Sequence, residues 1–154
     1  MKQVYVIDAC ALIDAAKNYN MSKNTFSSIW DKLNEMIETG ELISSTEIFD
    51  ELKDDDLKKW ANLYKKAFLP LSPAIQNKAK EVLKDYPNLI KIRSTSNSNG
   101  DPFLIATALV NNGCIVTNEK PGDEKQKDYH IPNVCVGMNI PYMNLRTFLD
   151  TILD

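Results

Sequence analysis

The sequence predicts an α/β fold, a three-layer α/β/α sandwich with a central, mostly parallel sheet. Short apolar runs rich in β-branched residues alternate with longer segments whose apolar side chains recur at helical spacing, and this alternation is typical of a parallel sheet between helical layers. The 154 residues suffice for one domain, and no repeat or linker divides them. We therefore expect a single domain over residues 1–154, with its ligand site at the carboxyl ends of the strands.

The first third of the chain predicts two strands and the helices that follow them. Residues 4–8 are a short β-branched run that ends in an acid, which suits a buried parallel strand. The apolar residues of 25–38 follow a helical stripe, and Gly40 is placed to end that helix. The other elements expected here are a helix at 10–19, a strand at 41–44, and a helix at 46–53 that Ser45 or Thr46 can cap.

Residues 57–93 are expected to form a basic helical region within the domain. A helix over 57–69 would place Phe68 with its apolar face, and Pro73 would start a second helix over 72–86. The region carries nine Lys and Arg against two acids, a local charge of +7 that leaves −10 on the rest of the chain. Such an asymmetry can build a positive face for phosphate beside a negative pocket for cations, although a merely solvated helical surface explains it equally well.

The last third of the chain predicts one well-marked helix and several short elements. The helix begins at Asp101, which caps it, has Pro102 at its first position, and ends at Gly113. Residues 114–119 follow as a strand. The other elements expected are a short extension at 89–92, a loop at 94–100, a polar loop at 120–130, a helix at 131–139, a strand at 142–144 and a closing helix at 145–154.

Composition limits the kinds of site that the chain can build. The three cysteines (Cys10, Cys114 and Cys135) are odd in number and lack CxxC spacing, so we expect reduced, partly buried thiols rather than disulfides or a zinc site. With one histidine, His130, which we expect to be a surface or packed residue, a metal site would use mainly oxygen ligands, as Mg²⁺ and Mn²⁺ prefer. No apolar stretch approaches the roughly 18 residues of a membrane span, and the start lacks a signal-peptide pattern, so we expect a cytoplasmic protein.

Four acids are predicted to meet at the carboxyl edge of the sheet. Asp8 ends the first strand, and Glu51 lies on the second turn of the helix after the second strand. Asp101 opens a helix, and Glu119 lies just past the next strand. Right-handed crossovers bring strand ends to one edge, and clustered carboxylates stay ionised mainly when a cation neutralises them. Each acid also has a structural interpretation, as a helix cap or a surface residue, and Glu47 competes with Glu51 for the same helix face.

On these residues the sequence resembles the PIN-domain family, the fold of VapC-like toxin ribonucleases. The resemblance lies in four stretches in order, VYVIDACALI, ISSTEIFDEL, GDPFLIATAL and CIVTNE, with IPNVCVGMNIPYMNL fitting the family's last helix and strand. Residues 57–93 match only loosely. The resemblance implies a Mg²⁺- or Mn²⁺-dependent endoribonuclease in which Asp8, Glu51 and Asp101 bind metal and orient the attacking water. Glu119 falls where the family more often has Asp, and its longer side chain favours a contact through water.

The resemblance also implies partners and supporting residues. Thr117 and Asn118 match polar positions that the family uses around its site, and Cys10 stands where a small polar residue is common. Many such toxins are dimers inhibited by an antitoxin, so RNA, an antitoxin protein and a second copy of the chain are the partners implied. The lysines that could guide RNA past the acids are Lys58, Lys59, Lys65 and Lys66.

Two other functions stay open. One is a PIN-like module that binds RNA or protein with weak or no catalysis, which the acidic overall charge and the Glu at position 119 favour. The other is a structure-specific DNA nuclease that uses the same acids. Receiver-domain and haloacid-dehalogenase chemistries fit less well, because the first strand ends in Asp-Ala-Cys and lacks both the paired acids and the DxD arrangement.

Overall fold

The computed structural model describes residues 2–89 and 101–153, and a five-stranded sheet runs through their centre. All four pairs of neighbouring strands are parallel, and the strand order is β3-β2-β1-β4-β5. Because the chain first adds strands on one side of β1 and then on the other, the direction of winding reverses between β1 and β4. The strands are β1 (Tyr5–Ile7), β2 (Leu42–Ser45), β3 (Phe68–Leu69), β4 (Cys114–Val116) and β5 (Tyr142–Met143).

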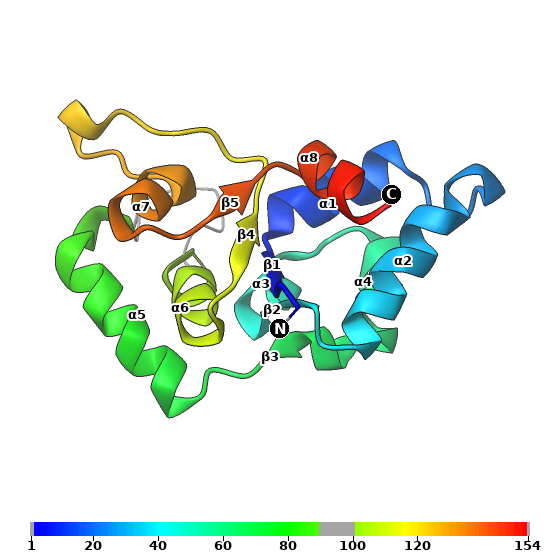
Figure 1. The fold of residues 1–154 in the computed structure, drawn as a ribbon, viewed down its shortest axis with the longest axis horizontal. Coiled ribbons are helices and arrows are strands. Elements are labelled where there is room, and N and C mark those ends of the chain that lie inside the picture. The colour runs from blue at the N-terminus through cyan, green and yellow to red at the C-terminus, as the bar shows by residue number, and fades with distance from the viewer. Residues whose placement is uncertain (1, 90–100, 154) are drawn as a thin grey trace.

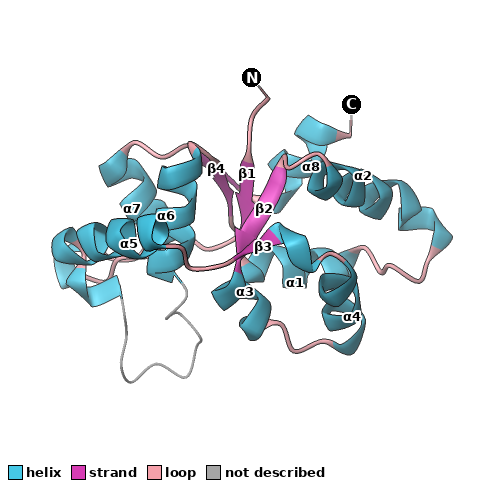
Figure 2. Cartoon of the chain, turned by 90° about the horizontal axis from the view of Figure 1, so that it is seen from below, coloured by secondary structure: helices cyan, strands magenta, loops and turns pink. Residues whose placement is uncertain are grey.

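Helices cover both faces of this sheet, as Figures 1 and 2 show, and the predicted three-layer sandwich is confirmed. One layer holds α5 (Pro73–Asp85), α6 (Asp101–Asn111) and α7 (Ile131–Met138), and the other holds α1 (Ala9–Asn18), α2 (Ser27–Glu38), α4 (Asp55–Leu63) and α8 (Leu145–Ile152). The short helix α3 (Thr46–Glu51) follows β2 at the end of the sheet away from the chain termini (Figure 2). Within the described part of the chain, no helix is long and apolar enough to cross a membrane.

The core lies where these layers meet the sheet. Val6 of β1 is fully buried, and the predicted apolar stripe of α2 is buried through Trp30, Leu33, Met36 and Ile37. Trp30 also packs edge-to-face on Trp60 of α4, with ring centroids 5.3 Å apart, which joins the two helices of that layer. Burying one large apolar side chain stabilises a fold by roughly 1.5–3 kcal/mol. Together, the buried side chains of β1, α2 and α4 therefore stabilise the packing of this helical layer on the sheet.

The predicted helix over 57–69 is wrong in its second half. The helix α4 ends at Leu63, a 3-10 turn follows, and Phe68 lies in the two-residue strand β3 beside the end of β2. Leu69 precedes Pro70, and a residue before proline is disfavoured in the helical conformation. The pairing also covers an edge of β2 that would otherwise be open. Phe68 is therefore part of the sheet and not of a helix face.

The end of α6 also differs from the prediction. Asn112 takes the left-handed conformation, with φ 53°, whereas Gly113 has no positive φ. Gly113 is required by packing instead, because a Cβ there would lie 2.7 Å from Cγ2 of Val6. Gly40 does adopt φ 80° after α2, as predicted. Leu89 lies in a 3-10 turn, while the rest of the predicted extension at 89–92 and the predicted loop at 94–100 lie outside the described residues.

Candidate functional site

Polar residues form a row at the carboxyl ends of the central strands. The registers of β1 with β2 and with β4, carried past the end of β1, place Asp8 between Ser45 and Thr117. The backbone N–H of Asp8 donates to the carbonyl of Val116 at 2.9 Å, so the β1–β4 pairing continues to this residue. The winding of the sheet reverses here, and ligands of open α/β sheets bind at such a point.

Asp8 is held in this row by three hydrogen bonds. Its Oδ1 accepts from the N–H of Ala9 at 2.8 Å, so it caps α1. Its Oδ2 accepts from the Thr117 hydroxyl at 2.9 Å and from the Cys10 thiol at 3.0 Å. Only 4% of the Asp8 side chain is exposed, and this burial raises its pKa, while the three hydrogen bonds act in the opposite direction. The residue is therefore both a helix cap and a buried carboxylate at the predicted site.

Glu51 shares an electrostatic environment with three other acids. It ends α3 and is partly buried. Burial raises its pKa to about 8, and the negative charges of Asp8, Glu47 and Glu119 contribute in the same direction. The structure thus brings Asp8, Glu51 and Glu119 into one region, as expected. The negative charge of Glu47 acts in the same region.

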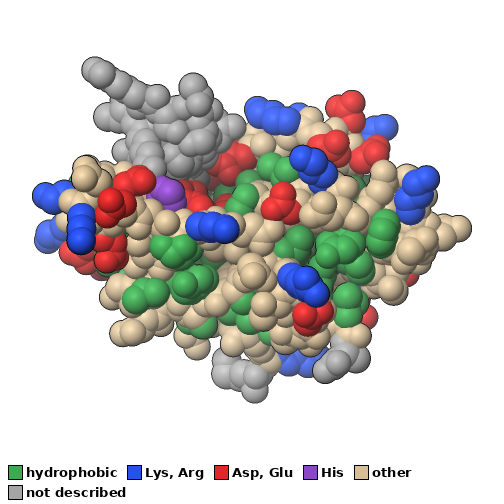
Figure 3. All heavy atoms as spheres, turned by 90° about the horizontal axis from the view of Figure 1, so that it is seen from above, with side chains coloured by type: hydrophobic (Ala, Val, Ile, Leu, Met, Phe, Trp, Pro, Cys, Tyr) green, Lys and Arg blue, Asp and Glu red, His purple; other side chains and the backbone are tan. Residues whose placement is uncertain are grey.

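The remaining two of the four predicted acids are Asp101 and Glu119. Asp101 is the first residue of α6, which packs against β1 and α3, and its side chain is 8% exposed. Glu119 is partly buried, its N–H donates to the Thr117 hydroxyl at 3.1 Å, and its Oε1 lies 3.6 Å from Nδ1 of His130. Acidic side chains lie on both sides of the histidine in Figure 3. His130 is thus partly buried, and its imidazole ring lies beside the carboxylates of Glu119 and Asp128.

The acidic and hydroxyl side chains of the site offer oxygen atoms, which Mg²⁺ and Mn²⁺ prefer as ligands. Among the described residues, no group of three or more His, Cys, Asp or Glu side chains is placed to share one metal ion. Mg²⁺ usually takes one or two carboxylates, however, and completes its octahedron with waters and substrate phosphate. The Ser45 hydroxyl is fully buried and has no hydrogen-bond partner within residues 2–89 and 101–153, which is rare for a buried polar group. These oxygen donors and this unsatisfied hydroxyl fit a hydrated Mg²⁺ or Mn²⁺.

Two further polar residues, Asp14 and Ser45, lie near the predicted site residues but are not predicted from the sequence. Asn118 joins three elements, because its Nδ2 donates to Oδ2 of Asp14 at 2.6 Å and its Oδ1 accepts from the N–H of Leu145 at 2.8 Å. These contacts tie the end of β4 to α1 and to the start of α8. Asp14 lies four residues after Cys10, so the shared helix face is a signal that could have identified it. Ser45 was expected only as a cap of α3, and its side chain makes no capping bond.

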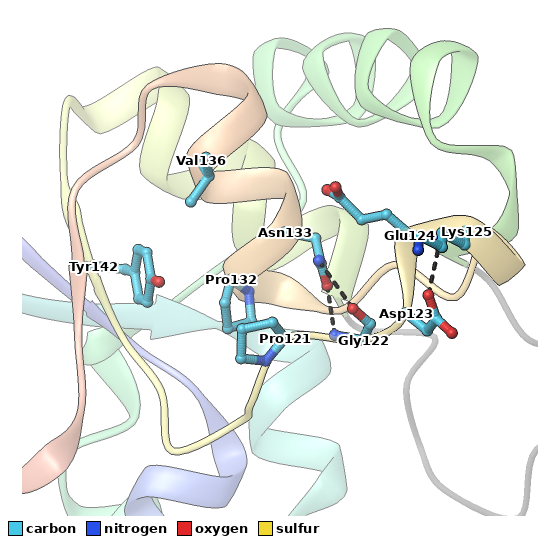
Figure 4. Close-up of a pocket in the computed structure, with 9 residues that line it drawn as sticks. All are labelled: Pro121, Gly122, Asp123, Glu124, Lys125, Pro132, Asn133, Val136 and Tyr142. Atoms are coloured by element: carbon cyan, nitrogen blue, oxygen red, sulfur yellow. Dashed lines mark hydrogen bonds between the residues drawn. The ribbon is translucent and has the colours of Figure 1, made fainter.

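The loop after Glu119 borders a pocket on α7 (Figure 4). The Asn133 amide holds this loop, since its Oδ1 accepts from the N–H groups of Gly122 at 2.7 Å and of His130 at 2.9 Å. A Cβ on Gly122 would lie 1.9 Å from the carbonyl oxygen of Asp128, so only glycine fits the loop. The predicted polar loop is confirmed, and it carries His130 to Glu119.

The candidate RNA-binding lysines are exposed. Lys58 and Lys59 lie on α4, and the other two follow it in the 3-10 turn. Lys65 lies with its Nζ 5.6 Å from the centroid of the Phe49 ring, and Lys66 forms an ion pair with Glu38. The three cysteines are free, as predicted, and burial raises the pKa of the Cys10 thiol to about 12.

The all-parallel sheet between two helical layers is an α/β/α sandwich with the PIN-like fold. Two of the solved structures that are similar to this chain show the same fold. VapBC2 from Rickettsia felis, crystallised with a DNA fragment from its promoter, has a TM-score of 0.52 at 15% identity and covers 92% of this chain and 98% of its own. PAE2754 from Pyrobaculum aerophilum has a TM-score of 0.53 at 16% identity and covers 99% of this chain and 98% of its own.

The chain belongs to the family described as a domain of unknown function, DUF4411, which matches residues 5–152. No curated protein matches the sequence. The resemblance to the PIN-domain family is confirmed at the level of the fold by the solved structures.

Proposed function

We propose that this protein is a divalent-metal-dependent endoribonuclease that hydrolyses RNA phosphodiesters, and that it is the toxin of a toxin–antitoxin pair. The observation that carries the proposal is the buried Asp8 at the reversal of the sheet, within electrostatic reach of Glu51. The likeness in fold to VapBC2 supports the nuclease class. An antitoxin partner, a homodimer and a cytoplasmic location are parts of the same proposal that the sequence resemblance motivates.

We propose Asp8, Asp101 and Glu51 as the residues that hold Mg²⁺ or Mn²⁺, with Glu119 acting through water. The bound cation would supply a water of lowered pKa and would stabilise a phosphoryl oxygen. The hydroxyl of Thr117 and the thiol of Cys10 fix the Asp8 carboxylate by donating to its Oδ2. With a pKa of about 8, Glu51 holds a proton at neutral pH in the metal-free protein and would release it when a cation binds.

We propose that the exposed lysines Lys58, Lys59, Lys65 and Lys66 bind the phosphates of RNA. Their region, residues 57–93, contains nine of the 18 Lys and Arg residues of the chain and has a local net charge of +7. A surface ion pair such as that of Lys66 with Glu38 contributes only about 0–1 kcal/mol, so a phosphate can replace the carboxylate at little cost.

Cleavage of a labelled single-stranded RNA by the purified protein tests the proposal. Activity should require Mg²⁺ or Mn²⁺, and Asp8→Asn or Asp101→Asn should lower it by about 10²-fold or more in a protein that still folds. Asp50→Asn is the matched control, because Asp50 is an exposed acid beside Glu51. Lys58→Ala with Lys59→Ala should raise KM more than Lys80→Ala with Lys84→Ala, which removes two exposed lysines from α5.

Three outcomes of this assay would contradict the proposal. Wild-type cleavage that persists in excess EDTA would exclude the metal-dependent mechanism. Faster cleavage of flapped DNA than of RNA would favour the DNA nuclease. RNA or protein binding without turnover would favour the binding module.

A further inference from the structure

Ser44 and Ser45 end β2 next to each other, but their hydroxyls have different surroundings. The Ser44 hydroxyl donates to the carbonyl oxygen of Ile7 at 2.6 Å, across the β1–β2 pair. The Ser45 hydroxyl is also buried, with 0% of the residue exposed, yet it makes no hydrogen bond among the described residues. The two adjacent serines are thus almost equally buried, but only the Ser44 hydroxyl has a hydrogen-bond partner among the described residues.

The strand register shows which space the Ser45 hydroxyl shares. Side chains in register on neighbouring parallel strands point to the same face of a sheet. Carrying the β1–β2 register past the end of β1 puts Ser45 directly beside Asp8, and Glu51 ends the short helix that follows Ser45. The register thus places the unsatisfied hydroxyl beside Asp8, in the row of polar residues at the strand ends.

A hydrated cation would satisfy this hydroxyl. A serine hydroxyl offers one donor and two acceptor positions, and the waters around Mg²⁺ or Mn²⁺ are strong donors. Unlike a further carboxylate, it would add no negative charge to a region where like charges already raise the pKa of Glu51.

We propose that Ser45 is a positioning residue whose hydroxyl accepts a hydrogen bond from the hydration shell of the divalent cation held at Asp8. This inference rests on the proposed function, because it presumes a cation at Asp8. It adds to the acids a neutral side chain that orients the cation's waters and does not itself coordinate the metal. Residues in this role change metal affinity by about 10–100-fold in other proteins.

The test is a calorimetric Mn²⁺ titration of wild type, Ser45→Ala, Ser45→Gly and Ser44→Ala, together with thermal unfolding of each in EDTA. Ser45→Ala should weaken Mn²⁺ binding about tenfold or more and leave the melting temperature of the metal-free protein unchanged or higher, since no hydrogen bond is lost. Ser45→Gly should show the same loss of affinity. Ser44→Ala should do the opposite, lowering the metal-free melting temperature because the Ile7 carbonyl loses its donor, while Mn²⁺ affinity stays within about twofold.

The outcomes separate this inference from the proposal on which it rests. Equal Mn²⁺ affinity in wild type and in both Ser45 variants would overturn the role of Ser45 and leave the metal site in place. A lower metal-free melting temperature in both Ser45 variants, with affinity unchanged, would show a structural role and would also overturn it. No Mn²⁺ binding by wild type would overturn the proposed metal site and the inference together.

Discussion

Glu51 shows how the site changes the chemistry of one residue. It lies at the end of α3, where burial and the charges of Asp8, Glu47 and Glu119 raise its pKa to about 8 from an ordinary value of 4.5. The folded protein therefore binds a proton at Glu51 over a pH range in which the unfolded chain has lost it. A region that holds protons in this way without metal is one in which a cation can displace them.

This shift predicts a pH-dependent stability of the metal-free protein. The folded pKa of Glu51 is raised, so its contribution is favourable below the unfolded value and is lost as the pH rises from 4.5 to about 8. Burial raises the pKa of Asp8 as well, which acts in the same direction. Denaturant unfolding in EDTA should therefore show a free energy of unfolding that falls as the pH rises through this range.

Glu51→Gln should reduce that pH dependence, because the variant has no proton to lose at this position. Asp50→Asn, one residue earlier and exposed, should leave the slope of the wild type unchanged. An identical slope in wild type and Glu51→Gln would show that the carboxyl of Glu51 is ionised normally in the folded protein.

At the scale of elements, the junction between α6 and β4 fixes where the strand end with Thr117 lies. Asn112 makes the left-handed turn, and Gly113 then passes so close to β1 that a Cβ would meet Val6 at 2.7 Å. The close approach sets β4 beside β1, and their register places Thr117 beside Asp8. A residue that appears to be a simple helix terminator in the sequence is thus needed for strand packing.

Gly113→Ala should destabilise the fold by about 1–3 kcal/mol, because the added methyl group overpacks a buried contact. Val6→Ala removes the opposing methyl groups, so the double variant should be more stable than the sum of the single changes, by about 0.5 kcal/mol or more. Gly40→Ala with Val6→Ala is the control pair, since a Cβ on Gly40 meets no atom within 4 Å and the two effects should add. Additivity in the Gly113 pair, measured by denaturant unfolding, would contradict the proposed contact.

Many of the elements that the sequence predicts correctly have a signal in their own residues. The stripe of α2, the Pro73 start of α5 and the buried strand β1 each depend on local sequence. The strand β3 has only two residues, which give no periodicity, and it exists because β2 offers an edge for pairing. Local sequence does not contain that partner, so the helical spacing alone predicts a helix that continues through Phe68.

At the scale of the whole molecule, topology predicted part of the candidate site. Asp8, Thr117, Glu51 and Glu119 lie in one region because parallel strands end at one edge, which can be argued from element order alone. The contacts of Asn118 with Asp14, and the unsatisfied hydroxyl of Ser45, depend on strand register and side-chain direction across elements distant in the sequence. No local pattern contains that information.

We propose that the carboxyl edge of the sheet holds a divalent cation between Asp8 and Asp101. The most direct test of this claim is anomalous diffraction from a crystal soaked in Mn²⁺, measured near the manganese absorption edge. We predict an anomalous peak within coordination distance of the Asp8 carboxylate and close to Asp101, which is absent from a crystal of Asp8→Asn soaked in the same way. No peak at this edge at high Mn²⁺ would contradict the claim and would favour a module that binds without metal.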